Sequence, residues 1–139
     1  MNRLARLPSR LLGRAALHAE RLVAAALAEE GVRRHHYAVL ATLTEHGPAS
    51  QAELGRRLWI DRSDMHAVLT DLESAGLVTR ERDTADRRRN VVAVTPAAAQ
   101  ALERLDARVA EAQAALLAQL DAAERSQLLD LLARLGGPD

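Results

Sequence analysis

Two predicted helix N-caps that lie close together in the sequence, Ser50 and Asp61, most strongly limit what this chain can fold into. Ser50 and Glu53 form the pattern of a capping box, in which Ser50 accepts from the Glu53 amide and the Glu53 carboxylate reaches back to the Ser50 amide. The helix that begins there is short, because Trp59 and Ile60 lead directly to Asp61, a second capping residue. Two short helices with so tight a link predict a helix-turn-helix.

A β-hairpin is predicted directly after the second of these helices. That helix keeps its apolar residues on one side and ends at Gly76; they are Met65, Val68, Leu69 and Leu72. The segment LVTRERDTADRRRNVVAVT, residues 77–95, then places two strand-like runs around a breaker-rich centre, residues 83–86. A hairpin at this position predicts a winged helix.

Longer helices are predicted on both sides of this centre. Residues 8–31 and 33–46 carry apolar residues at helical spacing, and each stretch meets a glycine at its end. After the hairpin, Thr95 is predicted to cap a long helix that has Pro96 in its first position. A last helix is predicted to begin at Asp121.

The long helix after Thr95 carries an apolar stripe that a lone helix has no means to bury. Its members alternate in steps of three and four: Leu102, Leu105, Val109, Ala112, Leu116 and Leu120. This is the spacing of a helix–helix interface. We therefore expect a homodimer built from residues 1–31 and 97–135.

Composition limits the class of protein further. A chain of 139 residues with 48% hydrophobic residues is long enough for one packed domain and too apolar for general disorder. It has no cysteine, which excludes a disulfide scaffold, a thiolate zinc site and a cysteine-based redox sensor. It also lacks an apolar run of about 20 residues and the apolar centre of a signal peptide, so we expect a cytoplasmic protein without membrane segments.

Enzymatic and metal-binding functions find little support in the sequence. No spacing suggests a nucleophile–base pair or a carboxylate pair, so we expect no enzyme and no cofactor. The five histidines, at positions 18, 35, 36, 46 and 66, raise the alternative of a metal-responsive regulator. The rings of His35 and His36 diverge on a helix, and His18 with Glu20 lacks the i,i+4 spacing of a ligand pair, so we expect no metal site.

Positive charge is concentrated in the hairpin although the formal net charge of the chain is zero. Residues 80–89 contain five arginines against three acidic residues, and the chain has no lysine. A guanidinium suits the narrow, electronegative minor groove of DNA, and Asp86 can pair with Arg88 and fix its direction. The alternative is that these arginines only solvate a loop and keep an edge strand unpaired.

The second helix of the helix-turn-helix has a face that can approach DNA closely. Opposite its apolar side it carries small or polar residues: Ser63, His66, Ala67 and Thr70. Such a face can reach the floor of a major groove and leave Arg62, Ser63, Asp64 and His66 near base edges. The alternative is an ordinary solvated helix face.

These motifs together resemble the winged-helix core of the MarR family of bacterial transcriptional regulators. The match covers residues 35–100 and includes IDRS at the start of the second helix, LESAGLV before the hairpin, D-x-R at Asp86 and Arg88, and VTP at residues 94–96. A glycine is common in the family where Trp59 stands, which implies an altered turn or an exposed Trp59. The chain also lacks the cysteine of the family's peroxide sensors.

The resemblance implies a mainly α fold with a small β-hairpin wing. Residues 1–139 then form a single MarR-like domain, in which 35–95 are the winged helix-turn-helix and 1–34 and 96–139 are dimerisation helices. It further implies a transcriptional regulator, expected to be a repressor, that binds a pseudo-palindromic double-stranded operator in the nucleoid as a homodimer. Many members lose DNA affinity when a small aromatic or phenolic anion binds between the dimerisation helices and the winged lobe. The competing interpretation is a winged helix that only docks other proteins.

Two sets of site residues follow from these considerations. The residues expected to contact DNA are Ser50, Gln51, Arg62, Ser63, Asp64, His66, Ala67, Thr70, Arg82, Asp86, Arg87, Arg88 and Arg89. The residues expected to line an effector pocket are Arg14, His18, His35, His36 and Tyr37.

Overall fold

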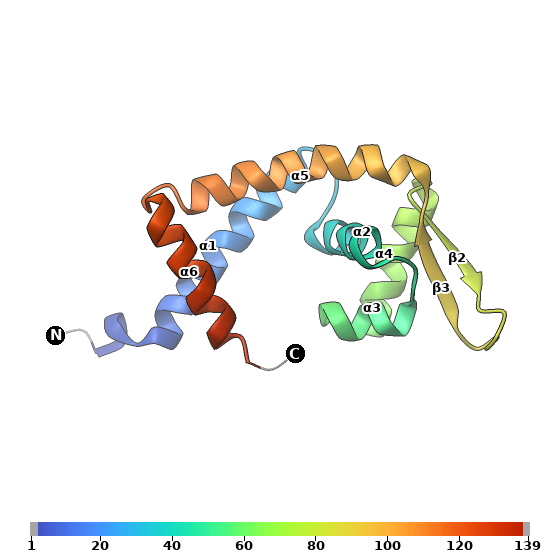
Figure 1. Ribbon diagram of the computed structural model, residues 1–139, viewed down its shortest axis with the longest axis horizontal. Helices are drawn as coiled ribbons and strands as arrows, with labels where there is room; N and C mark the ends of the chain where they lie inside the picture. The colour runs from blue at the N-terminus through green and yellow to red at the C-terminus, as the bar shows by residue number, and fades with distance from the viewer. Residues whose placement is uncertain (1–2, 138–139) are drawn as a thin grey trace.

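The structure is a computed structural model that describes residues 3–137, so the ends of the predicted domain, residues 1–2 and 138–139, lie outside the described residues. Its elements are a 3-10 helix Arg3–Arg6, α1 Pro8–Ala28, α2 Arg34–His46, β1 Ala49–Ser50, α3 Gln51–Leu58, α4 Arg62–Ser74, β2 Val78–Arg82, β3 Asn90–Val94, α5 Pro96–Leu116 and α6 Ala122–Leu135. Figure 1 shows α5 as a long arm with α2, α3, α4 and the hairpin below one end and α1 and α6 below the other. The predicted mainly α fold with a small β wing is confirmed.

Most of the core lies in the part from α2 to β3, residues 34–94, which we call the winged lobe. Leu27 of α1 and Ala98, Leu102 and Leu105 of α5 belong to the same buried cluster. The predicted apolar side of α4 is buried throughout and meets α2, α3 and the sheet; Met65, Val68, Leu69 and Leu72 are each at most 3% exposed. Complete burial of one side chain of this size contributes about 1.5–3 kcal/mol. The lobe therefore has a well-packed interior without a single phenylalanine.

The sheet has one strand more than the predicted hairpin. β2 and β3 pair antiparallel, with Val78 opposite Val94, and the short β1 pairs with the other edge of β3 through Ala49 and Ser50. A two-residue strand is too short to show the alternation that marks a strand in sequence. We use the term wing for residues 78–94, the two longer strands and the loop that joins them.

Two of the predicted helix caps differ in detail. The Ser50 hydroxyl accepts from the Glu53 amide at 3.1 Å as predicted, but the Glu53 carboxylate turns away and lies 3.0 Å from a guanidinium nitrogen of Arg89. The Thr95 hydroxyl makes no cap and instead donates to the Gly76 carbonyl at 2.6 Å. In both cases a tertiary partner, which the local sequence does not show, replaces the local one.

Trp59 forms the turn between α3 and α4. It adopts the left-handed conformation with φ 53° and ψ 45°, and it is the one non-glycine residue with positive φ among residues 3–137. Its side chain is 87% exposed, in agreement with the departure noted from the family pattern. The turn is so tight that a Cβ added to Gly55 would lie only 3.0 Å from the Ile60 carbonyl oxygen.

The apolar stripe of α5 is covered, at its first positions, by a helix of the same chain. Leu102 and Leu105 are buried against Leu27 and its neighbours on α1, in the same chain. The helix also ends at Leu116, so Leu120 lies in the turn before α6 and does not continue the stripe. The exposed leucines are elsewhere, at the start and on the first half of α1 and on α6. Among them are Leu7, which precedes the helix, and Leu11, Leu12, Leu17, Leu129, Leu131, Leu132 and Leu135.

Candidate nucleic-acid interface

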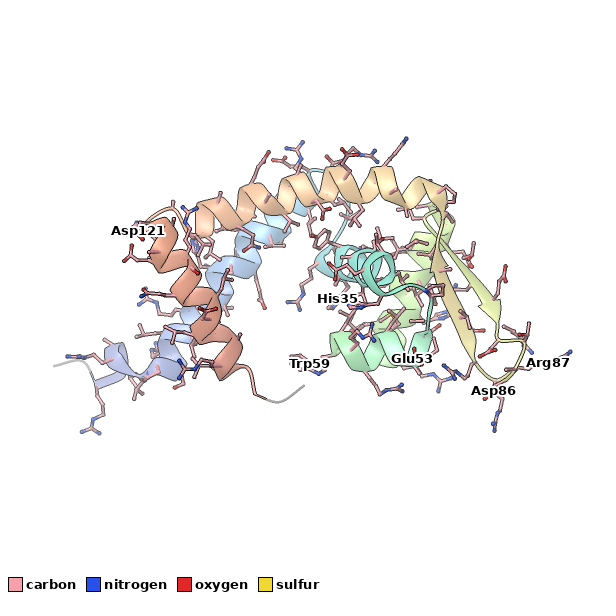
Figure 2. All side chains as sticks on the ribbon, in the orientation of Figure 1. His35, Glu53, Trp59, Asp86, Arg87 and Asp121 are labelled. Atoms are coloured by element: carbon pink, nitrogen blue, oxygen red, sulfur yellow. The ribbon has the colours of Figure 1, made fainter. Side chains whose placement is uncertain are left out.

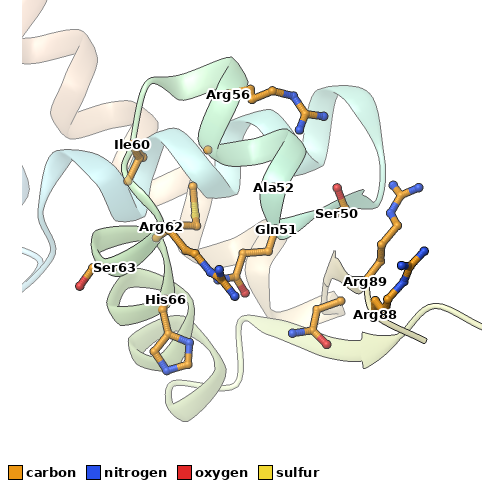
Figure 3. Close-up of a pocket in the computed structure, with 13 residues that line it drawn as sticks. Ser50, Gln51, Ala52, Arg56, Ile60, Arg62, Ser63, His66, Arg88 and Arg89 are labelled. Carbon is orange, nitrogen blue, oxygen red and sulfur yellow. The ribbon is translucent and has the colours of Figure 1, made fainter. Parts of the chain in front are cut away.

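A cavity of about 970 Å³ opens between α3, α4 and the wing. Seven of the residues predicted to contact DNA line it: Ser50, Gln51, Arg62, Ser63, His66, Arg88 and Arg89. The other predicted residues lie outside its lining: Asp64, Ala67, Thr70, Arg82, Asp86 and Arg87. Figure 3 shows Arg62 and His66 reaching out from α4, while Arg88 and Arg89 lie on the wing at the other side of the opening. Arg56 and Asn90, which sequence reasoning missed, also line the cavity.

The start of α4 is held by a side-chain cap. Asp61 accepts from the Asp64 amide at 2.8 Å and fixes the first turn, where Arg62 and Ser63 are exposed. The predicted small or polar face, which includes His66 and Thr70, is exposed along its length. The Asp61 carboxylate and Asp64 in the first turn both interact favourably with the positive end of the helix dipole, so this end of α4 is charge-compensated within the chain.

At the tip of the wing, Asp86 holds the side chain of Arg88. Asp86 accepts from both the backbone amide of Arg88 at 3.1 Å and its Nε at 3.2 Å, which confirms the predicted pair. The amide bond to Arg88, followed by the guanidinium, keeps the pKa of Asp86 below its ordinary value, so this carboxylate stays charged. The Arg88 side chain is 92% exposed and free to meet a ligand.

The five arginines of the hairpin do not form one uniform group. Arg80 is only 15% exposed and donates to Thr70 at 3.1 Å and to Glu73 at 3.2 Å, both on α4. Arg89 pairs with Glu53 on α3. Two arginines thus tie the wing to the helix-turn-helix, and Figure 2 shows Arg87 at the outer end of the wing. The signal for Arg80 was present in the alternation from buried Val78, which places Arg80 on the face that meets α4.

The residues proposed for an effector pocket have separate environments. The buried His36 ring accepts from the Arg33 amide through Nδ1 and lies 2.9 Å from Asp71 through Nε2, so both ring nitrogens are engaged. It lines a second cavity of about 270 Å³ beside Asp71 and Leu72. Neither of the two cavities includes the other candidates, Arg14, His18, His35 and Tyr37.

Tyr37 connects α2 to α5. Its hydroxyl donates to Asp106 at 2.7 Å. Burial, assisted by this bond to a carboxylate, raises the pKa of Tyr37 to about 12. His35 is half-buried nearby on α2, whereas Arg14 and His18 lie on the exposed surface of α1.

Among residues 3–137, no three His, Asp or Glu side chains come together as they would around a metal ion. Within the same residues, no helix combines the length and the apolar character needed to cross a membrane.

The arrangement of capped helices, sheet and exposed arginine tip defines a winged helix-turn-helix protein. A sequence model of the MarR family matches residues 30–89. A regulatory protein assigned to the hcr operon of Thauera aromatica is 36% identical over 106 residues, which cover 76% of this chain and 64% of that protein. The chain thus spans less than two thirds of the length of that relative. It belongs to the MarR family.

Solved structures of this fold include one protein bound to DNA and one bound to its natural ligand. The transcriptional repressor CouR, solved with a 23-mer DNA duplex, is 28% identical with a TM-score of 0.90, and the match covers 99% of this chain and 97% of CouR. The PcaV regulator of Streptomyces coelicolor, solved in complex with its natural ligand, is 28% identical with a TM-score of 0.79, covering 98% and 96% of the two chains.

Proposed function

We propose that this chain is a transcriptional regulator that binds double-stranded DNA in a sequence-specific manner. The observation that carries the proposal is that Arg62 and His66 of α4 and Arg88 of the wing border the same opening. An α-helix fits the major groove, and an arginine on the adjacent wing then reaches the neighbouring minor groove. In this arrangement α4 supplies contacts to base edges and the wing supplies Arg88.

We propose further that the regulator acts as a homodimer. The support is the set of exposed leucines on α1 and α6, which contrasts with the buried leucines of the winged lobe. Exposed leucines in such number mark interaction surfaces when they gather on one face, and a second copy of the same chain carries the same residues. A two-fold dimer presents two copies of α4 to the two halves of an operator.

We also propose that the protein is a cytoplasmic repressor released by a small aromatic or phenolic anion. The support is the similarity to the repressor CouR and to the ligand-bound PcaV. Of the five pocket candidates, His36 is the least available, since both its ring nitrogens have partners. Tyr37 and His35 on α2, with Arg14 and His18 on α1, remain as groups that could meet an anion between α1 and the winged lobe.

A charge-reversal experiment tests DNA binding against the alternative of a protein-docking wing. The double variant Arg87→Glu/Arg88→Glu should lose binding to labelled duplex DNA in an anisotropy titration. Arg104→Glu on α5, a residue with only a 3.9 Å exposed ion pair, makes the same type of charge change away from the opening and should bind as the parent does. Equal DNA affinity of the wing variant and the parent would favour the docking alternative.

A further inference from the structure

The four side chains of Arg80, His66, Thr70 and Glu73 form a hydrogen-bonded group that connects β2 to the middle of α4. Arg80 donates to Thr70 at 3.1 Å and to Glu73 at 3.2 Å through one nitrogen, and its other terminal nitrogen lies 3.3 Å from Nδ1 of His66. We call this group the Arg80 cluster. Three of its members lie on the helix that we propose enters the major groove.

The chemistry of arginine decides which nitrogen of His66 carries the proton. A guanidinium has only donors, so in the contact at 3.3 Å Nδ1 of His66 must be the acceptor. In a neutral imidazole whose Nδ1 accepts, the hydrogen is on Nε2. His66 is exposed, and it therefore presents an N–H donor at Nε2 to whatever approaches α4.

Arg80 itself is badly placed to contact a phosphate. Its side chain is only 15% exposed, and the carboxylate of Glu73 balances its charge at 3.2 Å. Thr70 is engaged as well, because its hydroxyl donates to the His66 carbonyl at 2.8 Å while it accepts from Arg80. Arg80 therefore differs from the exposed Arg88, although the two are close in the sequence.

We propose that Arg80 is a positioning residue that sets the base preference of His66. Resting on the proposed DNA-binding function, the inference is that the Nε2–H of His66 donates to an acceptor on a base edge. In the major groove, guanine offers O6 and N7, adenine N7 and thymine O4, whereas cytosine offers a donor. Arg80 thus makes α4 discriminate against cytosine at the position opposite His66.

The proton position on His66 is testable without any DNA. Nitrogen-15 NMR of the imidazole in the free parent protein should show Nδ1 as an unprotonated acceptor and Nε2 as the protonated nitrogen. In Arg80→Met, which keeps an apolar stem but no donor, His66 should become a mixture of the two tautomers. Arg80→Lys, which retains a donor, should stay closer to the parent. An identical tautomer in the parent and in Arg80→Met overturns the inference even if the protein binds DNA.

The second part of the test measures base preference by in vitro selection with the parent, Arg80→Met and His66→Ala. Arg80→Met should lose about fivefold to tenfold in preference at the base pair where His66→Ala loses it, the lower end of the range for a side chain–base contact. In the His66→Ala background, Arg80→Met should cause no further loss there. Preservation of the far-UV circular dichroism spectrum and melting temperature checks that each variant folds.

The salt dependence of DNA affinity distinguishes a positioning role of Arg80 from a direct contact between Arg80 and a phosphate. The slope of log affinity against log salt should be the same for Arg80→Met and for the parent. A slope flatter by about 1.8, which is what two lost phosphate contacts per dimer give, with uniform weakening across sequences, overturns the inference. A parent protein that selects no DNA sequence would instead overturn the proposed function.

Discussion

The winged lobe and the helices around it are built from the same few residue types but differ in how their apolar side chains are used. In the lobe, α4 alone contributes four buried residues, and Leu40 and Leu69 are completely buried. In α6 no residue is buried, and in α1 only Leu27 is. The lobe closes its core within one chain, whereas α1 and α6 keep exposed apolar side chains, on which we propose that a second copy packs. The comparison teaches that leucine content alone does not locate a core.

The largest effect should follow from removing a core side chain of the lobe. Leu69→Ala should lower the free energy of unfolding by about 2–5 kcal/mol, because the side chain is fully buried and its loss leaves a cavity. Urea unfolding at two protein concentrations measures it. The loss should be the same at both, since the contacts of Leu69 lie within one chain. A loss below about 0.5 kcal/mol, typical of surface sites, would remove the contrast between the two regions.

Substitutions on the exposed faces of α1 and α6 should change the association of two chains and leave the folding of each chain unchanged. Sedimentation of the parent at micromolar concentration should give twice the chain mass of 15.1 kDa. Leu12→Asp/Leu132→Asp should give single chains with unchanged helix content, because charges on these exposed faces repel a second copy. Trp59→Asp is the matched control: the side chain is 87% exposed but belongs to the lobe, and this variant should remain dimeric. A monomeric parent would contradict the homodimer.

Within the wing, two adjacent arginines provide a finer comparison. Arg88→Ala should weaken specific DNA binding by about 1–3 kcal/mol for each wing, measured by anisotropy at fixed salt. Arg89→Ala should cost less, because Arg89 is partly engaged with Glu53 in the free protein. Neither change should alter the melting temperature much, since the side chains of both residues are exposed. The reverse order of the two effects would mean that the wing enters DNA differently from the proposal.

The smallest effect concerns the contact between the lobe and α5. Tyr37 is the only tyrosine, so its phenolate absorbance is resolved, and its pKa should be about 12 against an ordinary 10. Because the pKa is raised in the folded state, the stability that Tyr37 contributes is complete below pH 10 and is lost as the pH rises toward 12. Asp106→Asn should lower this pKa but leave it above the ordinary value, since burial is the larger cause. A titration midpoint at the ordinary value in the parent would show that the Tyr37–Asp106 contact is absent.

The fold was predictable to the extent that local signals determine it. Caps at Ser50 and Asp61 and the glycine stop at Gly76 mark helix ends through contacts a few residues apart, so the bounds of α3 and α4 follow from sequence. The end of α5 does not follow in this way, because the helix stops at Leu116 and not at Leu120. The short strand β1 and the pairing of Glu53 with Arg89 depend on residues far apart in the chain, and no local pattern reveals them.

Many residues of the site could be predicted from the sequence, but the contacts that each of them makes could not. Composition alone does not separate the wing arginines, yet Arg80 is engaged by α4 and Arg88 is exposed. Only the strand alternation from Val78 distinguishes Arg80 before the fold is known. The stripe of α5 was a correct signal of helix–helix packing, but periodicity shows only that Leu102 and Leu105 need cover and not which helix supplies it. Only the tertiary arrangement distinguishes α1 from a second chain.

The measurement that tests the central claim most directly is selection of DNA by the parent protein from a random duplex library at moderate salt. We expect an enriched inverted repeat whose half-sites are centred about 10–10.5 base pairs apart, or a multiple of that, because two copies of α4 related by a two-fold axis must enter successive major grooves. Recovery of no common sequence, or of a single half-site bound by one chain, would contradict the account.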